Sequence, residues 1–133
     1  MSRHHYDCHV RFSDVDVYGH VNNVKYFEYY QESRLAFLMS LGRAEGEQGF
    51  SLVVARLDVD YKRPILFRPA PYLVESRVSR IGTSSFDVSS EIRDGETLLS
   101  RALATMVTFD QETQRARPLT EGERGRLEAV LEA

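Results

Sequence analysis

The chain has 133 residues, of which 42% are hydrophobic and 28% charged, and its formal net charge is -3, with acids and bases interleaved. These values are typical of a single soluble domain. They argue against a nucleic-acid-binding protein, because a phosphate binder carries a basic stripe. No apolar run approaches the ~20 residues that span a bilayer, and residues 1–10 lack the apolar core of a signal peptide. A lone cysteine, Cys8, cannot form an internal disulfide. We therefore expect one cytoplasmic domain over residues 1–133.

Alternation of apolar and polar residues predicts a first strand at residues 6–13. The side chains expected on one of its faces are Tyr6, Cys8, Val10 and Phe12. A polar stretch, DVDVYGHVN at residues 14–22, then interrupts the alternation. It stands directly before an amphipathic run, which raises the question of what so many polar groups do at the start of a helix.

The amphipathic run predicts a long helix at residues 23–41, because apolar residues recur at spacings of three and four. The residues expected on its buried face are Tyr26, Tyr30, Ser33, Phe37 and Leu41. Asn22 or Asn23 is expected as the N-cap and Gly42 as the stop signal. Residues 43–50 read as a charged loop.

Four strands are predicted after this loop, at residues 51–61, 72–81, 85–93 and 97–109. Asp94-Gly95 between the last two is a strong hairpin signal. The residues expected on one face of the first of these strands are Val53, Ala55, Leu57, Val59 and Tyr61. Those expected on one face of the last strand are Leu99, Leu103, Val107 and Phe109.

A capping box at residues 120–123, TEGE, predicts a short C-terminal helix at about 119–132. The order is then strand, long helix, four strands and short helix. Strands that follow one another predict a largely antiparallel sheet, and hence the α+β class. A single long helix covers one face of that sheet, so the remaining apolar surface and the sheet edges favour a homodimer.

The segment DVDVYGHVNNVKYFEYYQESR resembles the signature of the 4-hydroxybenzoyl-CoA thioesterase-like branch of the hotdog-fold acyl-CoA thioesterases. The residues that fit are Asp14, Asp16, Gly19, His20, Val21, Asn22, Asn23, Tyr26, Glu32 and Arg34. Two later segments, DYKRPI at residues 60–65 and IGTSSF at residues 81–86, resemble further motifs of this family in the same order. The resemblance spans residues 6–118.

The resemblance implies a hotdog fold, in which a curved antiparallel sheet wraps around one long central helix. It also implies a homodimer whose sheets join edge to edge, commonly paired again into a homotetramer, with active sites at the dimer interface. The implied reaction hydrolyses an acyl-CoA to a carboxylic acid and coenzyme A. Coenzyme A is then part of the substrate, and no cofactor or metal is expected.

Thioester hydrolysis needs a base or nucleophile and a site for the negative charge on the carbonyl oxygen. Asp16 matches the family's catalytic acid, although its spacing alone slightly favours a turn residue. The helix start supplies backbone N–H groups, so Asn23 or Val24 is expected to polarise the carbonyl. The Asn23 side chain is a candidate for orienting water, and His20 either lines the site or braces the loop. Asp14 is expected to be structural.

The substrate-binding candidates lie around these groups. Gly19 permits a tight turn or a close approach of the thioester, and Tyr26 is a candidate for the acyl pocket. Lys62, Arg63, Ser84 and Ser85 are candidates for the phosphates of coenzyme A. A metal site is not expected, because the residues His4, His5, Cys8 and His9 lack a second ligand cluster.

Two other functions remain open. Hotdog dehydratases act on β-hydroxyacyl thioesters and use a histidine with an acid, a pair that His20 and Asp16 could form. A non-catalytic acyl-CoA-binding hotdog protein is the third possibility, which the retained acid disfavours.

Overall fold

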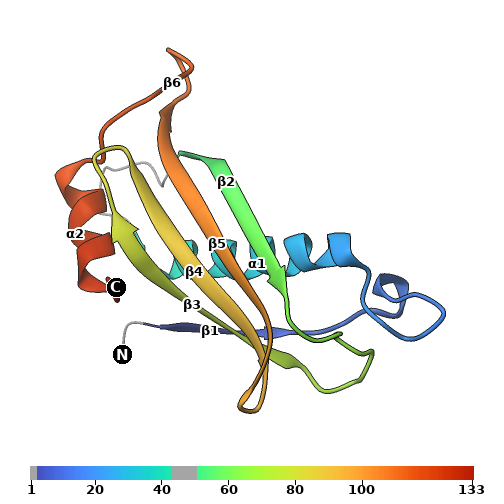
Figure 1. Ribbon diagram of the computed structural model, residues 1–133. Coiled ribbons are helices and arrows are strands. Elements are labelled where there is room, and N and C mark those ends of the chain that lie inside the picture. The colour runs from blue at the N-terminus through green and yellow to red at the C-terminus, as the bar shows by residue number, and fades with distance from the viewer. Residues whose placement is uncertain (1–2, 43–50) are drawn as a thin grey trace.

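The computed structural model describes residues 3–42 and 51–133, so the predicted loop at 43–50 lies outside the described residues. The elements in chain order are β1 (His4–Cys8), the 3-10 turn η1 (Phe12–Asp14), α1 (Asn23–Ser40), β2 (Leu52–Tyr61), β3 (Tyr72–Ile81), β4 (Ser85–Asp94), β5 (Thr97–Asp110), β6 (Arg115–Ala116) and α2 (Glu121–Ala129). The sheet has the order β1-β3-β4-β5-β2, β6 pairs with β5, and every pairing of strands is antiparallel. Figure 1 shows α1 crossing one face of the long, curved strands. The predicted α+β architecture is confirmed.

The long helix begins where the sequence predicts and ends one residue earlier, so Leu41, expected on its buried face, is the C-cap and only partly buried. Asn22 is the N-cap in an extended conformation, and α1 ends at Ser40, two residues before Gly42 with its φ of +70°. The residues on its buried face are Tyr26, Tyr29, Tyr30, Ser33, Arg34 and Phe37. The aromatic members pack on the sheet in two clusters, one around Tyr30 and one around Phe37.

The inward face of β5 differs from the prediction. The buried residues of its long central stretch are Ser100, Ala102, Ala104, Met106 and Thr108, whereas the expected residues Leu103, Val107 and Phe109 are only partly buried. Leu99 is buried as predicted. The physical reason is volume, because the large rings of α1 occupy the core and small residues on the facing strand make room for them.

The predicted alternation of β2 is broken in its first half. A bulge between Val54 and Arg56 shifts the register against β5, so that Val54, rather than Val53 or Ala55, lies opposite the buried Met106. Beyond the bulge, the expected residues Leu57, Val59 and Tyr61 do share one face, because they pair with the inward positions of β5. β2 is also an edge strand of the sheet.

The first strand is shorter than predicted. β1 ends at Cys8, and the chain turns into η1, where Phe12 is 80% exposed rather than in the core. The N–H and guanidinium of Arg11 both donate to the Asp14 carboxylate, and this contact closes the turn. The alternation of apolar and polar residues did not predict this turn, because Phe12 continues the apolar pattern of the strand.

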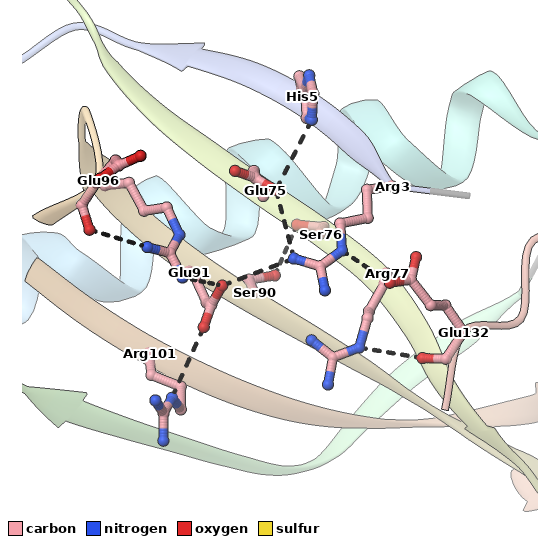
Figure 2. Close-up of polar contacts among 11 residues, drawn as sticks. Arg3, His5, Glu75, Ser76, Arg77, Ser90, Glu91, Glu96, Arg101 and Glu132 are labelled. Carbon is pink, nitrogen blue, oxygen red and sulfur yellow. Dashed lines mark hydrogen bonds and ion pairs between the residues drawn. The ribbon is translucent and has the colours of Figure 1, made fainter. Parts of the chain in front are cut away.

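The outer face of the sheet, away from α1, is polar (Figure 2). Glu91 on β4 lies among three guanidinium groups, with Arg93 at 3.0 Å and Arg3 and Arg101 at 3.9 Å each. Arg3 also pairs with Glu132, close to the C-terminus, at 2.9 Å. The core therefore lies on the helix side of the sheet. The ends of α1 and of the strands are where a site can be sought.

Candidate functional site

The polar stretch before α1 folds as a small hairpin, which we call the Asp16 hairpin and define as residues 15–21. Val15 and Val21 form a β-bridge at its base, and Asp16 N–H donates to His20 C=O at 2.9 Å. Gly19 N–H donates to Asp16 C=O at 3.0 Å, and Gly19 has a φ of +78°, a region that favours glycine. The hairpin therefore presents Asp16 in a fixed backbone geometry.

The Asp16 carboxylate is held by one of its two oxygens. Oδ1 accepts the N–H groups of Tyr18 at 2.9 Å and His20 at 3.1 Å. Oδ2 accepts no hydrogen bond from the residues that the structure describes. The turn function that spacing suggested and a chemical function are thus compatible, because each uses a different oxygen.

The start of α1 lies beside this hairpin. Asn22 N–H donates to Asp14 C=O and Lys25 N–H donates to Asn22 C=O, each at 2.9 Å. Within the described part of the chain, the N–H groups of Asn23 and Val24 have no such acceptor, as expected for the first residues of a helix. The helix start therefore offers two N–H groups and the positive end of its dipole.

A cavity of about 380 Å³ joins the hairpin, the helix start and the end of β2. Its lining residues are Asp16, His20, Val21, Asn22, Asn23, Tyr26, Tyr61, Lys62, Arg63 and Pro64. A carboxylate, a helix start and two cations thus converge on one concave surface of mixed aromatic and polar character. This is the composition expected of a small-molecule site.

Tyr26 forms the aromatic side of this cavity. Its phenol accepts Ile65 N–H at 3.3 Å, and its ring meets the Tyr61 ring edge-on with centroids 4.7 Å apart. Burial raises the pKa of Tyr26, so the phenol stays neutral at physiological pH. Tyr26 therefore presents an uncharged aromatic ring beside the cavity.

Most of the predicted site residues come together. The ones that line the cavity are Asp16, His20, Asn23, Tyr26, Lys62 and Arg63. Val24 contributes its backbone from the same first turn, with a side chain that is 67% exposed. Gly19 shapes the hairpin from behind, where its C=O accepts Phe67 N–H at 3.1 Å.

Ser84 and Ser85 do not join this cavity within one chain. Ser85 starts β4 opposite Val107 near the far end of β5, whereas Tyr61 lies opposite Ser100 near the beginning of β5. The Ser85 hydroxyl accepts the Arg80 guanidinium at 3.0 Å instead. Within one chain, these serines therefore stand at the opposite end of the sheet from the cavity.

Tyr61 is the site residue that sequence reasoning missed. Its hydroxyl donates to Asn23 C=O at 3.1 Å, so it connects the end of β2 to the first residue of α1. The sequence indicated Tyr61 on a strand face and within the DYKRPI segment that resembles a family motif, but gave it no role in the site. Its position at the end of a strand, before Lys62, Arg63 and Pro64, was the available signal.

Other candidate sites among the described residues are weaker than this cavity. A larger hollow of about 840 Å³ lies on the outer face of the sheet, but it is lined by arginines such as Arg93 and Arg101 that already contact Glu91. Within residues 3–42 and 51–133, no group of three histidine, cysteine, aspartate or glutamate side chains could hold a metal ion. In the same part of the chain, no helix is long and apolar enough to cross a membrane.

Comparison with known proteins identifies the family. The family model of the thioesterase-like superfamily matches residues 10–129. The chain is 31% identical to the uncharacterized protein YsmA of Bacillus subtilis, over 89% of this chain and 80% of that protein. It is 30% identical to the long-chain acyl-CoA thioesterase FadM of Escherichia coli, over 92% of this chain and 95% of FadM.

A solved structure gives the same result. A thioesterase of Thermus thermophilus, crystallised with coenzyme A and zinc, superposes with a TM-score of 0.81 at 30% identity, over 95% of this chain and 92% of that chain. The resemblance read from DVDVYGHVNN is confirmed, and with it the hotdog fold. The chain belongs to the thioesterase-like superfamily and is a thioester hydrolase.

Proposed function

We propose that this enzyme hydrolyses acyl-CoA, with Asp16 as its reactive carboxylate. The observation that carries the proposal is one cavity shared by Asp16 and the start of α1. The names of FadM and of the Thermus thioesterase structure, the latter containing coenzyme A, support an acyl-CoA substrate. A cytoplasmic location goes with this proposal, and the buried free thiol of Cys8 fits a reducing compartment.

The Asp16 carboxylate can act in either of two ways. As a general base, its Oδ2 removes a proton from a water molecule, and the hydroxide adds to the thioester carbon. As a nucleophile, Oδ2 itself adds to that carbon and forms an anhydride, which water then opens. In both routes the C–S bond breaks and the leaving thiolate of coenzyme A takes up a proton.

The first turn of α1 supplies the complementary charge. In this proposal the thioester oxygen accepts the N–H groups of Asn23 and Val24, because negative charge develops on that oxygen in the transition state. The Asn23 side chain lines the cavity and orients the attacking water or the carbonyl. His20 lines the same cavity next to Asp16.

The cations at the end of β2 suit the phosphates of coenzyme A. Lys62 and Arg63 both donate their backbone N–H to Leu99 C=O, at 2.9 and 3.0 Å, which fixes their position at the cavity. In the described residues, neither side chain is paired with a carboxylate. They therefore remain available for an anionic substrate.

We also propose a homodimer joined through β2, and its pairing into a tetramer remains a further expectation. β2 is an edge strand with half-exposed apolar residues, Val53 at 39% and Val54 at 45%. Antiparallel pairing of β2 with a second copy places the Leu52 end of one strand beside the Tyr61 end of the other. Ser84 and Ser85 lie at the end of the sheet that holds Leu52, because Ser85 and Val53 both pair with Val107. In such a dimer, each cavity would therefore gain these serines from the other copy.

The test follows thiol release from a panel of acyl-CoAs with short, long and aromatic acyl groups. We expect Asp16→Asn to lower kcat by about 10² to 10⁴-fold, the range of a general acid–base contribution. The variant retains an oxygen that accepts the Tyr18 and His20 N–H groups, so the hairpin is preserved and the loss reports on chemistry. Asp7→Asn, at an exposed position of β1, is the matched control and should remain fully active.

Three outcomes decide the proposal. Turnover of one acyl class that disappears in Asp16→Asn supports it. Full activity in the folded variant means that Asp16 is not the reactive group. A β-hydroxyacyl-CoA that loses water without releasing thiol would point to the dehydratase reaction instead.

A further inference from the structure

We propose that Asp14, Arg11 and Tyr29 form a brace that holds the Asp16 hairpin in register with the start of α1, with Asp14 and Tyr29 as positioning residues. The inference rests on the proposed function, because it assigns a purpose to the placement of Asp16. Arg11, Asp14 and Tyr29 are not among the residues that line the cavity.

The Asp14 carboxylate is fully buried, with 0% of its surface exposed, and both of its oxygens are used. Oδ2 accepts the Tyr29 hydroxyl at 2.6 Å and the Arg11 N–H at 3.0 Å, and Oδ1 accepts Arg11 Nη2 at 3.0 Å. Burial alone would raise the pKa of Asp14, but the hydrogen bonds from Tyr29 and Arg11 outweigh it and lower the pKa. The carboxylate is therefore ionised at neutral pH and its hydrogen bonds are charge-assisted.

The same residue also holds both ends of the hairpin. Asp14 directly precedes residue 15, and its C=O accepts the N–H of Asn22, which directly follows residue 21, at 2.9 Å. The Val15–Val21 bridge closes the hairpin immediately above this bond. The base of the hairpin is thus fixed to Asp14, and Asp14 is fixed by its side chain to Tyr29.

Tyr29 lies in α1, so its hydrogen bond to Asp14 connects the hairpin to this helix. The hairpin carries the proposed reactive carboxylate, while the first turn of α1 carries the proposed N–H donors. A bond from the hairpin base to the second turn of that helix couples the two halves of the site. Arg11 adds a second connection, because its Nη2 lies 3.7 Å from Glu28 of the same helix. Chemistry between a carboxylate and a carbonyl tolerates little misplacement, and about 1 Å can reduce the rate about 10²-fold.

The experiment compares two adjacent tyrosines of α1. Tyr29→Phe removes only the hydroxyl that binds Asp14. Tyr30 is also buried, and Tyr30→Phe removes a hydroxyl that donates to Ser100 on β5 at 2.7 Å and does not touch the hairpin. We expect Tyr29→Phe to lower kcat about tenfold with KM changed less than twofold, and Tyr30→Phe to leave kcat within twofold of the wild type.

Hydrogen exchange provides a second measurement, which reports on how firmly the Asp16 hairpin is held. Hydrogen exchange of a peptide covering residues 14–22 should accelerate in Tyr29→Phe and remain unchanged in Tyr30→Phe, while both variants lose a similar amount of thermal stability. Asp14→Asn, which removes the charged acceptor, should lower kcat at least as much as Tyr29→Phe does.

The outcomes separate this inference from the proposed function. Equal kcat and equal exchange in Tyr29→Phe and Tyr30→Phe, beside an inactive Asp16→Asn, would overturn the brace and leave the proposed function intact. Full activity of Asp16→Asn would overturn the proposed function itself.

Discussion

At the scale of single residues, the site depends on backbone conformation as much as on reactive groups. The Asp16 hairpin turns at Gly19, whose φ of +78° is strained for any residue that carries a Cβ. No heavy atom lies within 4 Å of a Cβ added at Gly19, so a substitution there meets open space and changes only the backbone energy. A substitution at Gly19 therefore tests the effect of backbone strain without a steric clash.

We predict that Gly19→Ala lowers the free energy of unfolding by about 1 kcal/mol and lowers kcat several-fold, because a relaxed hairpin misplaces Asp16. Urea denaturation and thiol release measure the two effects. Gly42→Ala is the control, since Gly42 has a similar φ of +70° and equally open surroundings at the other end of α1. It should show the same loss of stability with unchanged kcat. A Gly19→Ala enzyme with normal kcat would contradict the prediction.

At the scale of elements, α2 shows how a short helix is held by its first turn. Thr120 Oγ1 accepts Glu123 N–H at 3.1 Å, and Glu123 Oε1 accepts Thr120 N–H at 2.9 Å, a capping box that confirms the prediction from TEGE. The buried Glu123 carboxylate also pairs with Arg117 through two bonds of 2.8 Å. The hydrogen bond from Arg117 lowers the pKa of Glu123 below its usual 4.5.

We predict that Glu123→Gln lowers the free energy of unfolding at pH 7 by about 2 kcal/mol, because a charge-assisted pair is lost from a buried position. Since folding depresses the pKa of Glu123, its contribution is complete above pH 4.5 and declines as the pH falls through the folded pKa. The stability difference between wild type and variant should therefore shrink steadily below pH 4.5. Urea titrations at several pH values test this, and a difference that did not decrease as the pH falls below 4.5 would contradict it.

At the scale of the whole molecule, the sheet has two unlike edges. β1 is a short edge strand that continues into η1, whereas β2 is ten residues long and exposes Val53 and Val54. A long apolar edge is a template for pairing with another chain. The cavity lies at the Tyr61 end of this edge, so assembly and catalysis are expected to depend on each other.

We predict that Val54→Lys converts a dimer to a monomer, because a lysine on an edge strand opposes edge-to-edge pairing, and that activity falls with the dimer. Sedimentation velocity and thiol release measure both. Met39→Lys is the control, since Met39 is a 72% exposed apolar residue on α1, and it should leave the β2-paired dimer assembled. A monomeric wild type with full activity would refute the proposed interface.

Local patterns predicted the elements well because each pattern reflects neighbours along the chain. The spacing of apolar residues predicted α1, and Asp94-Gly95 predicted the hairpin between β4 and β5. Facing was harder to predict, because it depends on what packs opposite. Ala102 and Ala104 face the core in place of Leu103, since the helix fills that space with aromatic rings.

The candidate site likewise has a part that local sequence determines and a part that depends on the tertiary structure. The sequence by itself determined the polar turn that carries Asp16 and the start of α1, because these residues are contiguous and their polar groups bond to one another over short spans. Only the tertiary structure decided that Tyr61 reaches Asn23, that Tyr29 holds Asp14, and that one chain keeps Ser84 and Ser85 away from the cavity. These contacts join residues that lie far apart along the chain, and their geometry follows from strand order and side-chain volume, which no local pattern records.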